Sequence, residues 1–183
     1  MTSEADRRLL LQVARDAIIA QVTGTRAVAP AQAILNRAGG AFVTIHNRGE
    51  LRGCIGHIEA DEPLGRVVAR CATAACSLDP RFPALTADEL PDIDVELSLL
   101  MPLESIAGPA DIEIGRHGVV VEKGTRRGLL LPQVAAEWKW DAETFLAHTC
   151  HKAGLPRDAW REGATLWRFE AEVFGDSEGR ERR

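Results

Sequence analysis

The spacing of apolar residues predicts three main helices. Apolar residues recur three and four positions apart over residues 4–22, 63–78 and 141–153, which is typical of amphipathic helices. Asp141 is a good N-cap for the last of them, and Gly154 is a good C-terminal stop. Thr86 opens a capping-box sequence, which predicts a further short helix that ends at Pro91.

Alternation of apolar and polar residues predicts strands, some of them joined by tight turns. Asn47-Arg48-Gly49-Glu50 is typical of a hairpin turn, because Asn and Gly tolerate a positive φ. Helices and hairpin-connected strands are mixed along the chain, so the pattern predicts an α+β fold with a largely antiparallel sheet flanked by helices. The predicted strands are residues 41–46, 51–58, 93–99, 112–114, 119–122, 129–131 and 165–174.

Length and charge narrow the class of protein. The 183 residues predict a single domain over residues 4–175 and a disordered tail over residues 176–183. The net charge of −5 and the lack of a basic stripe argue against nucleic-acid binding, which relies on cationic side chains. No apolar run is long enough for a membrane span, and the polar N-terminus does not read as a signal peptide. We therefore expect a cytoplasmic protein with reduced thiols.

The segment Leu51-Arg52-Gly53-Cys54-Ile55-Gly56 carries the strongest chemical signal. Glycine weakens a strand, so two glycines beside one cysteine indicate a bulge or the close approach of a ligand or another backbone. A cysteine acts as a nucleophile only as a thiolate, with a cation or base nearby. In a regular strand Arg52 and His57 face away from Cys54, so a small buried structural cysteine is the alternative.

Other polar residues are candidates for the same site. His117, between glycines, is a candidate base, and Glu96 is a candidate carboxylate; each could instead be an idle surface residue. Arg52 and Arg81 could hold an anionic ligand or form structural ion pairs. His148, Cys150 and His151 lack a second ligand pair at zinc spacing, so we expect no metal site.

Six segments carry a family resemblance, in the same order as in the family. They are Leu51–Gly56, Asp79–Phe82, Val95–Leu100, Gly115–Gly118, Leu130–Ala135 and Lys152–Pro156. Together they resemble the AMMECR-type domain family, also called AmmeMemoRadiSam system protein A. The resemblance covers about residues 7–175 and implies an α+β fold with a larger and a smaller subdomain. It establishes no reaction and no cofactor, but it implies a pathway shared with a Memo-like protein and a radical SAM protein.

Two hypotheses follow. In the first, the chain is an enzyme or enzyme subunit with Cys54, His117 and Glu96 as catalytic residues. Its ligand would contact Arg52, Gly53, Gly56 and Arg81. In the second, it is a non-catalytic module that docks a partner on the Leu51–Gly56 segment.

Overall fold

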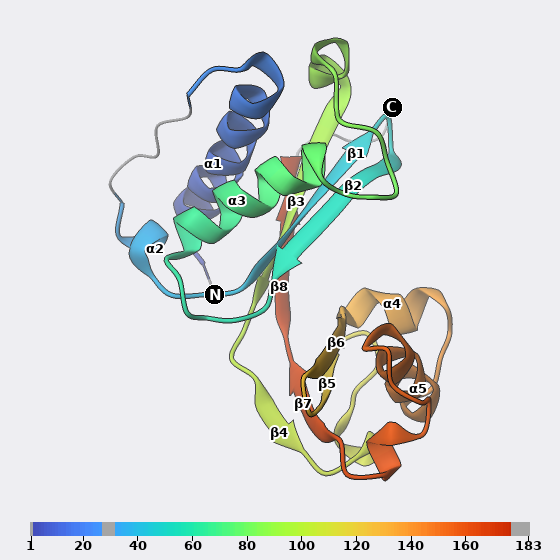
Figure 1. Ribbon diagram of the computed structural model, residues 1–183. Helices are drawn as coiled ribbons and strands as arrows, with labels where there is room; N and C mark the ends of the chain where they lie inside the picture. Colours follow the sequence, from blue (N-terminus) through green and yellow to red (C-terminus); the bar gives the residue numbers. More distant parts are fainter. Residues whose placement is uncertain (1, 27–31, 177–183) are drawn as a thin grey trace. The chain divides into compact units, whose positions relative to one another are not determined.

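The protein divides into two compact units. The computed structural model describes residues 2–26 and 32–176. One unit comprises Met1–Leu100 and Glu172–Arg183, and the other comprises Met101–Ala171 (Figure 1). These correspond to the larger and smaller subdomains that the family resemblance implied. The single domain over residues 4–175 stays a prediction. The predicted disordered tail, residues 176–183, lies outside the described residues apart from Asp176.

A four-stranded sheet forms the frame of the first unit. Its order is β2 (Glu50–His57), β1 (Ala41–Asn47), β3 (Ile93–Leu100) and β8 (Ala171–Gly175). The predicted hairpin between β1 and β2 is confirmed, and Arg48 and Gly49 have φ values of 52° and 87° in its turn. Because β1 pairs with β2 on one side and β3 on the other, it lies inside the sheet, whereas β2 lies at an edge.

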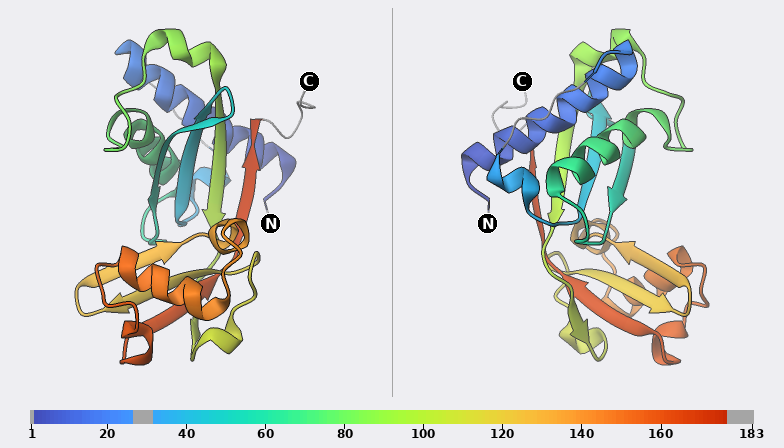
Figure 2. Two further views of the ribbon diagram at one scale, coloured as in Figure 1. Left: turned by 90° about the vertical axis from the view of Figure 1, so that its right-hand side faces the viewer. Right: turned by 60° about the vertical axis from the view of Figure 1, so that its left-hand side comes forward.

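Two helices cover one face of this sheet, as Figure 1 and Figure 2 show. They are α1 (Glu4–Thr23) and α3 (Leu64–Ser77), and the short α2 (Ala33–Asn36) packs beside α3. Both predicted apolar stripes are buried against the sheet; in α3 the stripe includes Val67, Val68, Cys71 and Ala72. Burial of these apolar side chains is the main stabilising force of the unit. The capping box at Thr86 opens a 3-10 helix, Ala87–Asp92, which contains Pro91 and does not end at it.

The second unit has its own sheet and core. The strand order is β4 (Glu104–Ile106), β7 (Thr165–Phe169), β5 (Gly118–Lys123) and β6 (Arg126–Leu130). Helix α5 (Ala142–Lys152) packs on β5 and β6, with Phe145, Leu146 and Cys150 fully buried. The predicted N-cap is confirmed, because the Asp141 carboxylate accepts a hydrogen bond from the Thr144 N–H. Short helical segments complete the unit: Pro109–Asp111, α4 (Pro132–Glu137) and Ala159–Arg161.

Two predicted strands were wrong, and two short elements were missed. The strand predicted over residues 165–174 is two strands, β7 and β8, which belong to different sheets. Residues 112–114 form no strand and lead into a turn that begins at Ile114. The sequence pattern did not reveal β4, which pairs with β7. It also did not reveal α4, although Pro132 at the first turn is a typical helix start.

The fold class is confirmed. Helices and antiparallel strand pairs together make this an α+β protein. A search of the described helices found none with the length and apolar character that a bilayer crossing requires.

Candidate functional site

Strand register brings Cys54 and Glu96 to one face of the first sheet. Thr44 on the inner strand β1 lies opposite Cys54 on β2 and opposite Glu96 on β3. Residues directly opposite one another in antiparallel strands point to the same face. Neighbouring strands are about 4.8 Å apart, so the Cα atoms of Cys54 and Glu96 are separated by roughly 10 Å. A thiol, a hydroxyl and a carboxylate therefore form a row across three strands.

This row lies on the face that is turned away from α1 and α3, which we call the open face. Gly53 shows the direction, because a Cβ atom built on it would lie 2.1 Å from the Ala75 carbonyl oxygen of α3. Gly53 therefore faces the helices, and alternation along β2 turns Cys54 to the other side. Of the reasons considered for the glycines, the structure provides the close approach of another backbone at Gly53 and a bulge beside it at Arg52.

The Cys54 sulfur has a polar neighbour. It is half-buried, and Thr44 Oγ1 donates a hydrogen bond to it at 3.4 Å. The other three cysteines are buried, in the core clusters of the two units. Burial raises the pKa of the Cys71 thiol to about 11, and it also raises the pKa of Cys76 and Cys150. Cys54 is therefore the cysteine that solvent and reagents reach most readily.

The loop after α3 closes the sheet edge beside Cys54. The Cys54 N–H donates to Asp79 Oδ2 at 2.9 Å, which satisfies an edge-strand donor. Asp79 is buried, and it also accepts hydrogen bonds from the backbone and guanidinium of Arg81. The Arg81 hydrogen bond is the main cause that holds the Asp79 pKa well below its usual range.

Arg81 is a cation close to the thiol. Its side chain is 53% exposed, and its guanidinium lies over the ring of Phe82. The Asp79 carboxylate raises the pKa of Arg81, with a smaller contribution from Cys54. One edge of the guanidinium binds Asp79, so the exposed part faces solvent with its charge intact.

Arg52 has a structural role in the first unit. The register of the hairpin shifts between Ile45 and His46, which leaves Arg52 as the extra residue of a β-bulge. Its guanidinium binds Glu89 at 2.8 and 3.0 Å and the carbonyl oxygens of Pro83 and Ala84. These contacts tie β2 to the 3-10 helix, and the predicted binding of an anionic ligand by Arg52 stays a prediction.

Gly56 makes room for an aromatic ring. A Cβ atom on Gly56 would lie 2.3 Å from the ring of Phe42, its opposite residue in the register. The ring covers the glycine on the open face, an arrangement that stabilises a strand glycine through packing. The predicted ligand contacts of Gly53, Gly56 and Arg81 stay predictions.

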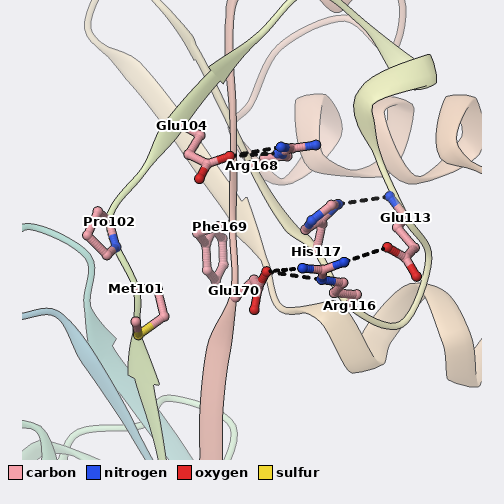
Figure 3. Close-up of a pocket in the computed structure, with 9 residues that line it drawn as sticks. All are labelled: Met101, Pro102, Glu104, Glu113, Arg116, His117, Arg168, Phe169 and Glu170. Atoms are coloured by element: carbon pink, nitrogen blue, oxygen red, sulfur yellow. Dashed lines mark hydrogen bonds and ion pairs between the residues drawn. The ribbon is translucent and has the colours of Figure 1, made fainter. Parts of the chain in front are cut away.

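His117 belongs to the second unit, where it lines a pocket of about 450 Å³ (Figure 3). The pocket has an apolar side with Met101, Pro102 and Phe169, and a charged side with glutamates and arginines. Burial is the main cause that lowers the His117 pKa, and the charges of Arg168 and Arg116 lower it further. Cys54 and Glu96 lie in the first unit, so the predicted catalytic pairing of His117 with them stays a prediction.

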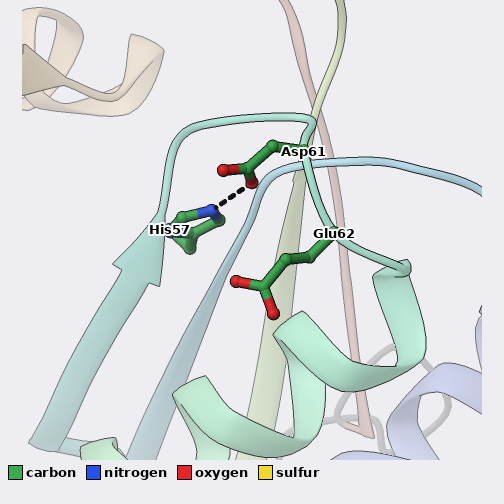
Figure 4. Close-up of side chains that lie close together, drawn as sticks. All are labelled: His57, Asp61 and Glu62. Carbon is green, nitrogen blue, oxygen red and sulfur yellow. Dashed lines mark hydrogen bonds and ion pairs between the residues drawn. The ribbon is translucent and has the colours of Figure 1, made fainter.

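A second polar cluster follows β2. Potential ligand atoms of His57, Asp61 and Glu62 lie within 4.8 Å of one another (Figure 4). His57 Nε2 is 2.7 Å from Asp61 Oδ1, and Glu62 forms an ion pair with Arg70. The hydrogen bond from His57 lowers the Asp61 pKa. These contacts pair Glu62 with a cation outside the cluster, and they direct His57 to Asp61.

Sequence reasoning missed two residues that contact Cys54. Thr44 gave no signal, because its partnership depends on a strand register that the bulge at Arg52 alters. Asp79 stood out only as part of the block Asp79–Phe82, and within that segment it accepts a hydrogen bond from the Arg81 N–H. The contact of Asp79 with the Cys54 N–H could not be predicted, because the two residues are 25 positions apart in the sequence.

These features define an α+β protein with two units, in which the first displays a half-buried cysteine on the open face of its sheet. The AMMECR1 family model matches residues 11–174, and the chain belongs to this family. A protein of Methanothermobacter thermautotrophicus is 43% identical over 182 residues, covering 94% of this chain and 95% of its own. Protein MJ0810 of Methanocaldococcus jannaschii is 46% identical over 156 residues, covering 80% of this chain and 78% of its own.

A solved structure has the same fold. The crystal structure of uncharacterized protein PH0010 from Pyrococcus horikoshii matches with a TM-score of 0.85 and 39% sequence identity. The match covers 94% of this chain and 92% of that one, so both units are included.

Proposed function

We propose that this chain is an enzyme, or a subunit of one, that uses the thiol of Cys54 on the open face. The observation that carries the proposal is the hydrogen bond from Thr44 Oγ1 to a half-buried Cys54 Sγ. A nucleophilic cysteine sulfur needs a hydrogen-bond donor or a cation in its surroundings. Thr44 supplies the first, and Arg81 supplies the second.

The row of side chains suggests how a substrate would lie. A substrate placed over Thr44 would have the Cys54 sulfur on one side and the Glu96 carboxylate on the other. The Cys54 sulfur would form a bond to a carbonyl carbon of the substrate while the carbon–oxygen π bond breaks. Glu96 would relay the thiol proton to the carbonyl oxygen. The exposed part of Arg81 would bind an anionic group of the substrate. The family association with Memo-like and radical SAM proteins suggests that the reaction belongs to a shared pathway.

Alkylation of the folded protein tests the proposal. We expect iodoacetamide to modify Cys54 much faster than Cys71, Cys76 and Cys150, whose burial raises their pKa. Peptide mapping by mass spectrometry across a pH series gives the rate for each cysteine in one sample. Equal alkylation rates for Cys54 and the three buried cysteines would contradict the proposal.

A second candidate function is a docking module without catalysis. Leu51 is 40% exposed on the edge strand β2, and an edge strand offers unpaired backbone groups to a partner. The partners proposed for this surface are the Memo-like protein and the radical SAM protein. The two functions differ at the thiol, because docking does not require Cys54 to react.

A pull-down with each partner tests the docking surface. We expect Leu51→Glu to weaken capture, whereas Cys54→Ser leaves capture unchanged if docking is the function. Ile19→Glu is the matched control, since Ile19 is 43% exposed on α1, away from β2. Capture of the Leu51→Glu variant at the wild-type level would exclude this surface.

A further inference from the structure

His117 is held in one orientation by its own turn. Glu113 donates its N–H to His117 Nδ1 at 2.9 Å, and its carbonyl oxygen accepts the His117 N–H at 2.9 Å. Gly115, with a φ of 87°, closes the turn between them. Because Nδ1 accepts a hydrogen bond, the ring proton lies on Nε2. The lowered pKa of His117 keeps this tautomer in place at neutral pH.

The Nε2–H group is an unused donor at the pocket. Residue His117 is only 7% exposed, and its side chain lines the cavity shown in Figure 3. Among the described residues, none forms a hydrogen bond with Nε2. A donor that faces a cavity and has no partner in the protein is suited to an acceptor from a ligand.

The charged rim of the pocket favours a cation over an anion. Arg116 lies between Glu113 and Glu170, and Arg168 binds Glu104 and the Asp111 carbonyl oxygen. Both guanidinium groups are thus occupied by partners within the unit. By contrast, Glu104, Glu113 and Glu170 each use one carboxylate oxygen in these contacts, so three carboxylates face two arginines around the cavity.

We propose that the second unit holds its own ligand site, for a small molecule that carries an ammonium group beside a carbonyl group. The carbonyl oxygen would accept the His117 Nε2–H, and the ammonium would bind the free oxygens of Glu104 and Glu170. An aliphatic group would pack on Met101 and Phe169. A volume of about 450 Å³ is within the range of small-molecule sites. This site is separate from the function proposed for Cys54.

Three related probes separate the parts of the proposal. L-leucinamide has the ammonium and the carbonyl, N-acetyl-L-leucinamide is neutral, and N-acetyl-L-leucine is an anion. We expect leucinamide to give a saturable shift of the His117 ring signals in an NMR titration at neutral pH. The neutral probe should bind more weakly, and the anion should bind least. His148 and His151 in the same unit are internal controls, because neither lines the pocket.

His117→Asn tests the donor while keeping the turn. The Asn side-chain oxygen can accept the Glu113 N–H as Nδ1 does, but it has no group at the Nε2 position. We expect this variant to bind leucinamide at least about tenfold more weakly. The shift of the Gly118 amide signal in the NMR titration measures the affinity. Circular dichroism would verify the fold.

Three results would overturn the site. They are His117 signals that none of the probes moves, wild-type affinity in folded His117→Asn, and tighter binding of the anion than of the cation. Leucinamide binding should be unchanged in Cys54→Ser, so the failure of this site and the failure of the thiol proposal are distinguishable. If His117→Asn does not fold, the wild-type titration with the three probes still decides the question.

Discussion

At the scale of single residues, Thr44 is the side chain whose hydroxyl directly contacts the Cys54 sulfur. We expect Thr44→Val to slow the alkylation of Cys54 at neutral pH by roughly three- to tenfold, the effect of losing one hydrogen bond to the thiolate. Thr149→Val is the control, because Thr149 donates to the Phe145 carbonyl oxygen in the other unit. An unchanged Cys54 rate in Thr44→Val would show that the hydroxyl does not assist the thiolate.

Glu89 should make the stability of the first unit depend on pH. The Arg52 hydrogen bond is the main cause that lowers the Glu89 pKa from 4.5 to about 2. A carboxyl group whose pKa is lower in the folded state stabilises the fold fully at pH values above its unfolded-state pKa. That stability is lost as the pH falls to its folded-state pKa. We expect Glu89→Gln to reduce the free energy of unfolding by about 1–3 kcal/mol at pH 7, because a partly buried charged hydrogen bond is lost.

Urea denaturation over a pH series checks this dependence. The difference between wild type and Glu89→Gln should shrink as the pH falls from 4.5 to about 2. Glu4→Gln is the control, because Glu4 is exposed and forms an i,i+4 ion pair worth less than about 1 kcal/mol. A difference for Glu89→Gln that stays constant over this range would contradict the role assigned to the Arg52 contact.

Residue identity allowed part of the site to be predicted. A cysteine beside two glycines pointed to Cys54, and an acidic residue in an apolar strand pointed to Glu96. Thr44 could not be found this way, since its contact depends on a register set by the bulge at Arg52. The ion pair of Arg52 with Glu89 joins residues 37 positions apart, which no local pattern reveals.

At the scale of elements, the close contact between β2 and α3 depends on Gly53. An added methyl group would meet the Ala75 carbonyl oxygen at 2.1 Å, so the helix or the strand would have to move. We expect Gly53→Ala to destabilise the protein by about 1–3 kcal/mol through overpacking, measured by urea denaturation.

Gly108→Ala is the matched control for this contact. A Cβ atom on Gly108 would meet nothing within 4 Å, and its φ of 173° is extended backbone that alanine adopts readily. The change in stability should stay within about 0.5 kcal/mol. If both glycine variants lose similar stability, close packing does not explain Gly53.

Periodicity predicted long elements better than short ones. Helix α1 and the β1–β2 hairpin were confirmed because their apolar spacing extends over several turns or pairs. Strand β4 has only three residues, too few to show alternation. The segment 165–174 alternates throughout, but Glu170 separates β7 from β8, and alternation does not reveal which sheet a strand joins.

At the scale of the whole molecule, most buried apolar side chains of the described residues belong to two clusters, one in each unit. We expect Phe145→Ala, a fully buried change in the second cluster, to cost about 3–5 kcal/mol. Hydrogen exchange should then speed up mainly in the amides of β5, β6 and β7. Leu97→Ala is the reciprocal variant, since Leu97 is fully buried in the first cluster.

The same exchange data test whether the clusters are distinct. Each variant should lower protection in its own sheet more than in the other sheet. Equal loss of protection in β1 and β5 for both variants would mean that the two clusters unfold as one. The mixture of elements predicted the α+β class, and the family resemblance implied two subdomains. The pattern of elements did not show where the division falls, because the first unit is built from both ends of the chain.

The path of the chain through the first sheet has a practical consequence. The chain leaves after Leu100 and returns at Ala171, where the Met101 N–H binds the Glu170 carbonyl oxygen at 2.8 Å. Gly175 lies beside Val95 and Glu96, so β8 runs back along β3. The polypeptide between them is therefore a long insertion between β3 and β8, whose ends nearly meet. A short loop in place of this insertion would be enough to join the two strands as a hairpin.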